Sequence, residues 1–236
     1  MKKVVILQHV YGKSQKKVLD LIKTLVENEL KDLEVKIEIS VTPENWVEFS
    51  LEGEDEEISA NYLVSSYGTP ASKIESGKVY AGFLQVLEEG AFVVNIGIPV
   101  RVEASELKIL GFGKPKQLAS RFGLIPHLKV EVEIFEANGK QKARFTKKQL
   151  DLWWSWKKAA NDRIIVNGAT RSEIKNAIKK TGHGKDILKV ERLGTLENVL
   201  LCKETTDGPG IVAAIGPYIK SEMGVVIGNS KVIRRS

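Results

Sequence analysis

The chain has 236 residues, a formal net charge of +6 and 42% hydrophobic residues, which is typical of a globular protein with more than one domain. No apolar run reaches the roughly 18 residues that a membrane span needs, and the N-terminus turns polar too quickly for a secretion signal. With Cys202 as the single cysteine, the chain can form neither an internal disulfide nor a cysteine metal cage. We therefore expect a soluble protein of the cytoplasm.

Charge is divided unevenly along the chain. Residues 1–72 carry 8 Lys and Arg against 13 Asp and Glu, a net charge of −5. Residues 73–150 carry 13 against 8, and residues 151–236 carry 15 against 9, which gives net charges of +5 and +6. Basic surfaces attract phosphate backbones, whereas acidic surfaces repel them. The split favours RNA contact by the two basic segments. The alternative is that solvated faces simply differ in sign.

The acidic segment predicts a β-α-β-β-α domain. Its apolar residues follow first a buried-strand pattern, then helical spacing, then strict alternation. The final helix has acids in its first turn and a glycine at its end. The expected elements are a strand at 3–10, a helix opened by Gly12 and Ser14, strands at 33–41 and 46–51, and a helix at 54–68.

After a linker at residues 69–72, the pattern changes to short strands separated by glycines. The expected elements are strands at 78–87, 91–96 and 100–103, two helical turns within 114–123, and a hairpin at 127–146 that turns at Asn138-Gly139. Five strands with a short helix between the third and the fourth are typical of a small, partly open barrel.

A tryptophan-rich helix follows, with Thr146 as its cap and its end near Ala160. Helical spacing gathers its core residues on one face; they are Leu152, Trp153, Trp156, Ala159 and Ala160. Trp154 lies elsewhere on the wheel, among lysines. Its indole either docks against a neighbouring domain or forms a plate on which bases stack.

From Asp162 onward the order of elements is β-α-β-β-α-β, which predicts a ferredoxin-like domain. The expected elements are a strand at 163–169, a helix at 171–182, strands at 187–194 and 197–204, a helix at 207–222 and a strand at 224–228. The Pro209-Gly210 helix start also resembles that of ACT domains, which bind small molecules, but proline is ordinary at that position.

The central segment carries several motifs of a known family in the right order. These are "SGKVYAGFLQVLEEGAFVVNIG", "VEASELK" and "NGKQKARFTKK". On these motifs, residues 76–148 resemble the S1 domain, an RNA-binding member of the OB-fold superfamily. The whole chain resembles an uncharacterised archaeal protein family, and that likeness implies no activity.

The S1 resemblance implies specific binding residues. Phe92 matches an aromatic of the family's stacking platform, and Lys142 and Arg144 match basic residues of its last strand. Two departures weaken the platform, because carboxylates, Glu89 and Glu103, stand where the family has an aromatic and a histidine.

A basic insertion in the central segment offers replacement phosphate contacts. They are Lys108, Lys114, Lys116 and Arg121. The alternative is an ordinary solvated loop.

No catalytic pattern emerges from the sequence. The three histidines are far apart, "GFGKPK" lacks the spacing of a phosphate loop, and no pair of carboxylates is singled out for acid–base chemistry. We expect no enzyme activity, no metal and no cofactor.

The sequence thus predicts an α+β multidomain chain, a central S1/OB-like five-stranded β-barrel flanked by two ferredoxin-like α/β modules. The predicted domains are an acidic domain at 1–72, the barrel at 73–148, and a connecting helix with the C-terminal domain at 149–236. The leading hypothesis is a non-catalytic RNA-binding protein of the ribosome, RNA-processing or transcription machinery. Its acidic domain would contact a protein partner. One alternative is a protein–protein adaptor with a structural barrel, and another is metabolite sensing by the C-terminal domain.

Overall fold

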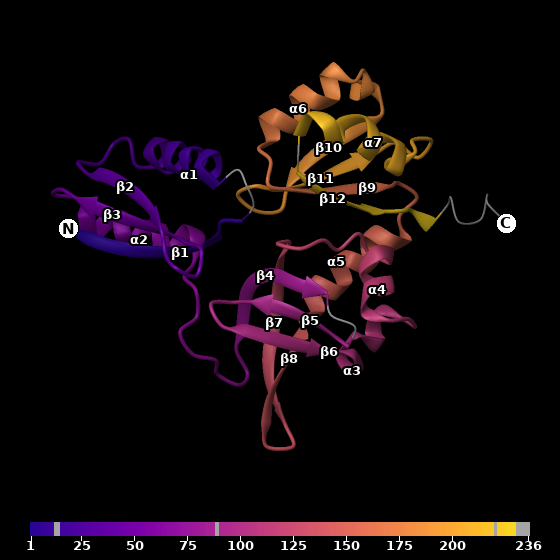
Figure 1. Ribbon diagram of the computed structural model, residues 1–236, viewed down its shortest axis with the longest axis horizontal. Coiled ribbons are helices and arrows are strands. Elements are labelled where there is room, and N and C mark those ends of the chain that lie inside the picture. The colour runs from indigo at the N-terminus through magenta and orange to yellow at the C-terminus, as the bar shows by residue number, and fades with distance from the viewer. Residues whose placement is uncertain (12–14, 88–89, 220, 230–236) are drawn as a thin grey trace. The chain divides into compact units, whose positions relative to one another are not determined.

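The computed structural model describes residues 1–11, 15–87, 90–219 and 221–229. It divides into two compact units. Unit 1 consists of Met1–Ile74 and Ile96–Ile98, and unit 2 of Glu75–Asn95 and Pro99–Ser236. These residues form an α+β structure with three antiparallel sheets, whose elements are labelled in Figure 1. In the described part of the chain, no helix is long and apolar enough to cross a membrane.

Unit 1 contains a three-stranded sheet with two helices on one face. Its elements are β1 (Lys2–His9), α1 (Gln15–Glu29), β2 (Lys36–Val41), β3 (Trp46–Glu52) and α2 (Glu56–Tyr67). The strand order is β1-β3-β2. Ile22 of α1 and Leu63 of α2 pack with Phe49 of β3 in one core. This order of elements matches the prediction, but Gly12 and Ser14 lie outside the described residues.

The central part of unit 2 is a five-stranded sheet with a helical insertion. Its elements are β4 (Val79–Leu87), β5 (Ala91–Asn95), β6 (Pro99–Glu103), α3 (Ala104–Leu107), η1 (Lys108–Leu110), α4 (Pro115–Arg121), β7 (Lys129–Ala137), β8 (Lys140–Phe145) and α5 (Lys147–Lys158). The strand order is β6-β5-β4-β7-β8. The edge strands β6 and β8 also contact each other, although no backbone pairing joins them among the described residues.

The β7–β8 hairpin turns at Asn138 and Gly139, as predicted. Their φ angles are 54° and 67°, and a tight two-residue hairpin turn requires such left-handed backbone at both central positions. Thr146 caps α5 by accepting a hydrogen bond from the backbone N–H of Gln149 at 3.2 Å. Both local predictions are confirmed.

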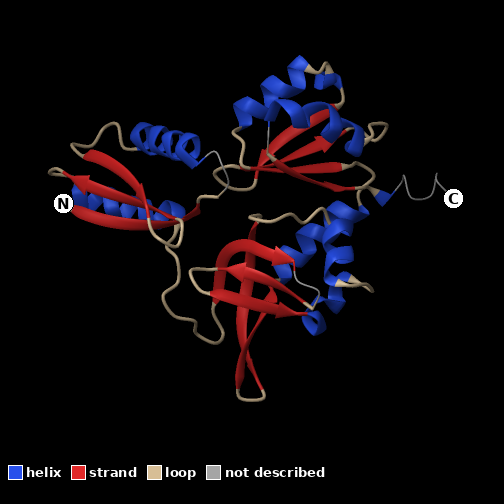
Figure 2. Cartoon of the chain, viewed as in Figure 1, coloured by secondary structure: helices blue, strands red, loops and turns tan. Residues whose placement is uncertain are grey.

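The C-terminal part of unit 2 is a four-stranded antiparallel sheet. Its elements are β9 (Arg163–Asn167), α6 (Arg171–Lys180), η2 (His183–Lys185), β10 (Ile187–Arg192), β11 (Glu197–Cys202), α7 (Gly208–Ile219) and β12 (Glu222–Val226). The strand order is β10-β11-β9-β12. Ile174 of α6 and Ile215 of α7 share a core with Ile164 and Leu200, so both helices cover the same face of the sheet, as Figure 2 shows.

The other face of this sheet contacts the central part of unit 2. Asn167 points away from the helices, because it follows the core residue Val166 in a strand. Its side-chain N–H donates to the carbonyl oxygen of Pro126 at 3.0 Å. A Cβ atom at Gly224 of β12 would collide with the backbone of Gly123, just after α4. The two backbones therefore meet with no room for a side chain.

Candidate nucleic-acid interface

Phe92 lies inside the central domain, which corrects its predicted role. Its side chain is 0% exposed, and its ring centroid lies 6.0 Å from that of Phe145. Its cross-strand neighbour in β6, Val102, is also buried. Side chains of adjacent residues alternate between the faces of a strand, and the pleat turns Phe92 inward with Val102. Its ring therefore has no exposed face on which a base could stack.

Lys142 and Arg144 lie on the outer face of β8, where Arg144 already has protein partners. Its Nε atom lies 3.0 Å from Oε2 of Glu133, and its guanidinium carbon lies 4.8 Å from the centroid of the Phe135 ring. The hydrogen bond from Arg144 to Glu133 raises the pKa of Arg144 above its ordinary value. Lys142 stands opposite Phe135 in the β7–β8 ladder. Of the three basic residues of β8, Arg144 is thus paired with a carboxylate of the neighbouring strand.

Of the two carboxylates that weaken the S1 resemblance, Glu103 lies within the described residues. Oε1 of Glu103 accepts from Nε of Arg101 at 3.2 Å, so its charge is at least partly balanced. Glu89 lies outside the described residues.

The insertion between β6 and β7 presents the most exposed aromatic side chain of the described residues. Phe112 is 97% exposed. It stands between Gly111 and Gly113, whose φ angles are 105° and 138°. Backbone of this kind is accessible to glycine and strained for other residues. The two glycines therefore hold Phe112 at the tip of a loop, outside the hydrophobic core.

Three exposed lysines lie within four residues of Phe112 along the same insertion. They are Lys108, Lys114 and Lys116, and within the described part of the chain none of them is paired with a carboxylate. We call Phe112 and these three lysines the insertion site. A cavity of about 500 Å³ lies beside them, lined by Phe112, Lys108 and apolar side chains that include Leu107 and Leu118. The site combines an aromatic face, an apolar hollow and uncompensated positive charge.

Arg121 and Trp154 hold the insertion in place. Nη2 of Arg121 donates to the carbonyl oxygen of Phe112 at 3.0 Å. Nε1 of Trp154 donates to the carbonyl oxygen of Ile109 at 3.2 Å, and its ring meets the Phe122 ring edge to face at 5.1 Å. Arg121 is therefore a positioning residue for the loop rather than a side chain left free for phosphate.

Trp154 combines parts of both sequence interpretations. It docks, but onto the insertion of its own domain rather than onto a neighbouring one. One face of the indole has Lys158 above it, with Nζ 5.8 Å from the ring centroid. The ring is partly exposed, so a small area remains beside the insertion site.

The other tryptophans of α5 are core residues, as predicted. Trp153 is 1% exposed and Trp156 is 5% exposed. The expectation for Leu152 was wrong: it is 39% exposed, and Leu150 is buried instead. The buried residues of α5 are thus Leu150, Trp153 and Trp156, which are spaced three residues apart.

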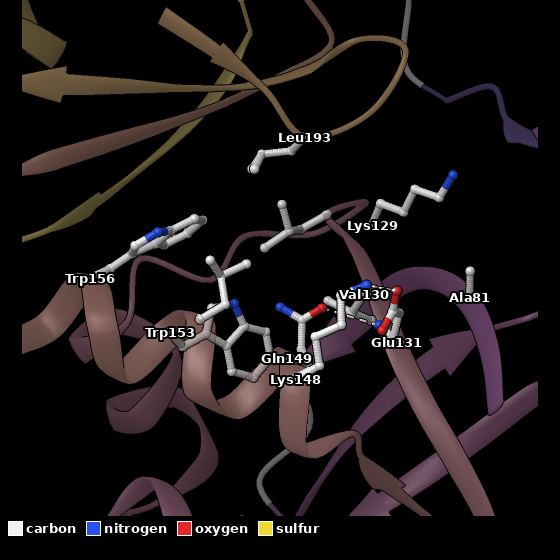
Figure 3. Close-up of a pocket in the computed structure, with 11 residues that line it drawn as sticks. Ala81, Lys129, Val130, Glu131, Lys148, Gln149, Trp153, Trp156 and Leu193 are labelled. Carbon is white, nitrogen blue, oxygen red and sulfur yellow. Dashed lines mark hydrogen bonds and ion pairs between the residues drawn. The ribbon is translucent and has the colours of Figure 1, made fainter. Parts of the chain in front are cut away.

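A small pocket lies where α5 meets the C-terminal domain. Figure 3 shows Trp153 and Trp156 on one side, and Leu193 from the turn after β10 on the other. Its volume is about 210 Å³. Nζ of Lys148 lies 3.0 Å from Oε1 of Glu131 at its rim. Because it is small and this ion pair balances charge at its rim, we interpret it as a packing gap, with α5 as a wedge between the two domains of unit 2.

Phe112 is the candidate site residue that the sequence interpretation missed. The stretch "GFGKPK" lacks the spacing of a phosphate loop. Comparing it with a phosphate loop gives Phe112 no role. An aromatic residue between two glycines cannot belong to a helix or strand interior without cost, and this is the signal that could have identified it.

Other chemistry is sparse in the described part of the chain. No group of three or more His, Cys, Asp and Glu side chains there could hold a metal ion. Cys202 is buried within the C-terminal core. Lys157 donates to the carbonyl oxygen of Ile227 at 2.9 Å, and burial lowers its pKa. The contact between Lys157 and Ile227 joins α5 to the C-terminal domain.

The fold and the insertion site define a three-domain α+β protein with a basic, aromatic-bearing surface on its central domain. The chain belongs to the DUF2110 family. It matches the family's N-terminal domain at residues 3–73, its central domain at 74–157 and its C-terminal domain at 161–227. No S1 or OB-fold domain is identified by this comparison. No curated protein matches the sequence.

Proposed function

We propose that this protein binds RNA without catalysing a reaction, and that the insertion site carries the contact. The proposed setting is the ribosome, RNA-processing or transcription machinery of the cytoplasm. The observation that carries the proposal is Phe112, an aromatic ring that is 97% exposed, on an insertion whose three exposed lysines have no carboxylate partner among the described residues. Proteins that bind single strands combine rings on which bases stack with lysines that hold phosphates, and each stacked base contributes about 1–3 kcal/mol.

The strand order of the central sheet supports an S1-like barrel as the scaffold. With the five strands numbered along the chain, the order is third-second-first-fourth-fifth, and the third and fifth strands contact each other. This is the arrangement expected of a partly open five-stranded barrel of the OB type. The C-terminal order, β10-β11-β9-β12, likewise supports a ferredoxin-like domain. The unit 1 sheet, β1-β3-β2, has the strand order of this C-terminal sheet without its last strand, β12.

The proposed contact differs from that of the S1 family in its location. Phe92 is buried and Arg144 is paired, so the strands of the barrel offer a weak platform. The insertion supplies the aromatic and basic groups instead. Lys142 stands as a further contact that lies outside the insertion.

The test is fluorescence anisotropy of a labelled single-stranded oligouridylate at several salt concentrations. We expect Phe112→Ala to weaken binding about tenfold or more. A triple change of Lys108, Lys114 and Lys116 to Ala should abolish most of the salt-dependent affinity. Tyr218→Ala is the matched control, because Tyr218 is 58% exposed and has Lys180 near its ring. An equal loss in both aromatic variants, or no binding at low salt, would contradict the proposal.

A second candidate is a protein–protein adaptor, and unit 1 provides the observation that favours it. Ile58, Tyr62 and Val64 of α2 are 60%, 40% and 43% exposed. Glu56 and Glu57 lie in the first turn of the same helix. Both acids are already paired, Glu56 with the N-terminal ammonium group and Glu57 with Lys2, so the exposed apolar side chains carry this alternative. Pull-down with Ile58→Ser and Tyr62→Ser variants would test it, and this partner contact is compatible with RNA binding in unit 2.

A further inference from the structure

A second basic site lies in the C-terminal domain, between α6 and β10. It is a groove of about 630 Å³. We call it the α6 groove. Its lining residues come from α6, from the turn through η2 and from β10; they are Arg171, Lys175, Ile178, Lys179, Gly182, Gly184, Lys185, Ile187, Leu188, Lys189 and Val190. Among these described residues none is acidic and none is aromatic.

Positive charge follows one wall of the α6 groove. Arg171, Lys175 and Lys179 are spaced four residues apart, so they lie on one face of the helix, about 6 Å apart along its axis. Lys185 adds a cation from the turn. Among the described residues, no carboxylate forms an ion pair with any of these four. Lys189, on the opposite wall, is paired with Glu191 at 2.8 Å.

Aliphatic side chains form the floor of the α6 groove. Ile178 and Val190 are buried, whereas Leu188 is 54% exposed. The β10–β11 register shifts between Ile187 and Lys189, so Leu188 is an extra residue in a bulge. Bulges re-aim side chains and blunt the edge of a sheet against further strands. The bulge therefore leaves Leu188 exposed on the groove floor and disfavours an added strand at this edge.

We propose that the α6 groove binds an acidic, aliphatic segment of a partner protein. Carboxylates on such a segment would pair with the cations of α6, while its leucine or isoleucine side chains would cover Leu188. A nucleic acid would satisfy only the first requirement, because none of the described lining residues has a ring on which a base could stack and the floor is aliphatic. Charge complementarity and the exposed aliphatic floor together select a peptide. This proposal does not rest on RNA binding by the insertion site.

The test uses a labelled peptide that alternates Glu with Leu, titrated into the full-length protein. A Gln–Leu peptide and a polyglutamate peptide of equal length serve as comparison probes. We expect only the Glu–Leu peptide to bind well. Lys175→Ala with Lys179→Ala should weaken its binding roughly tenfold, and Leu188→Ala should weaken it several-fold with little change in salt dependence.

Matched variants and probes make each outcome decisive. Lys108→Ala with Lys116→Ala removes the same charge from the insertion site and should leave peptide binding unchanged. Equal binding of polyglutamate would show mere charge attraction and overturn the proposal, as would absence of binding. Loss of oligouridylate binding in the Lys175/Lys179 variant, without loss of peptide binding, would assign the groove to nucleic acid. All these side chains are exposed, so circular dichroism should show unchanged folding.

Discussion

The insertion site and the α6 groove are both basic, but their uncharged components differ. The insertion site presents Phe112, an aromatic ring that is 97% exposed. The α6 groove presents Leu188 on an aliphatic floor and has no ring among its described lining residues. Lysine alone does not distinguish a phosphate from a carboxylate, so the neighbouring apolar groups decide which polymer fits. Two regions of equal charge sign can therefore suit different partners.

The two sites also differ in how they are supported. The α6 groove is built from a regular helix and a strand that share one core. The insertion site sits on short helical turns that Arg121 and Trp154 tie down through hydrogen bonds to backbone carbonyl oxygens. Its binding should therefore be more sensitive to changes at distant supporting residues.

The largest expected effect is on the free energy of unfolding, from a change in the buried face of α5. Trp153→Ala removes a fully buried side chain that packs edge to face on Phe145 at 4.8 Å. We expect a loss of about 3–5 kcal/mol in the free energy of unfolding, measured by urea denaturation followed by circular dichroism. Leu152→Ala, at the neighbouring exposed position, should cost much less. Equal losses in the two variants would contradict the packing described for α5.

A change at the junction between the two domains of unit 2 should affect binding at the insertion site more than binding at the α6 groove. A Cβ at Gly224 would meet the carbonyl group of Gly123, next to α4 of the insertion. Gly224→Ala should therefore destabilise unit 2 by about 1–3 kcal/mol and weaken RNA binding more than peptide binding. Gly216→Ala is the control: Gly216 lies in α7, where an added Cβ would have no neighbouring atom within 4 Å, and the change should cost less than Gly224→Ala, with a small penalty from Pro217, which follows it. Equal effects on both ligands would show that the junction does not support the insertion.

A smaller effect is expected at Trp154. Trp154→Phe keeps an aromatic ring but loses the hydrogen bond to Ile109. The loss should cost about 1 kcal/mol of stability and weaken oligouridylate binding modestly, while the Glu–Leu peptide binds as before. Anisotropy with both probes measures this. Weaker peptide binding would mean that Trp154 does not act through the insertion.

The smallest effect is a change in salt dependence. Each phosphate contact on a single strand contributes a slope of about −0.7 in log affinity against log salt. Lys116→Ala should reduce the RNA slope by about that amount, whereas Lys179→Ala should leave it unchanged. A reduced RNA slope in Lys142→Ala would show that β8 also contacts phosphates. A reduced slope in the Lys179 variant would place RNA in the α6 groove.

Local structure followed from local sequence over most of the chain. Alternating residues predicted β2, the Asn138-Gly139 pair predicted the hairpin turn, and Thr146 predicted the start of α5. In each case a few adjacent residues contain the whole physical cause.

The candidate sites followed from sequence only in part. The run Ala91–Asn95 is apolar on both faces, so no alternation showed that Phe92 points inward. The role of Arg121 depends on a loop that folds back onto its helix. The α6 groove depends on a bulge at Leu188. A change of register depends on both strands of the pair, so the sequence of one strand alone does not predict it.

The most direct test of the central claim is photo-crosslinking of 4-thiouridine-labelled RNA to the full-length protein, with the crosslinked residues identified by mass spectrometry. The account predicts crosslinks concentrated at Phe112 and the neighbouring residues of the insertion, and their loss in Phe112→Ala. Crosslinks concentrated in α6 and β10, or on unit 1 with none in the insertion, would contradict it.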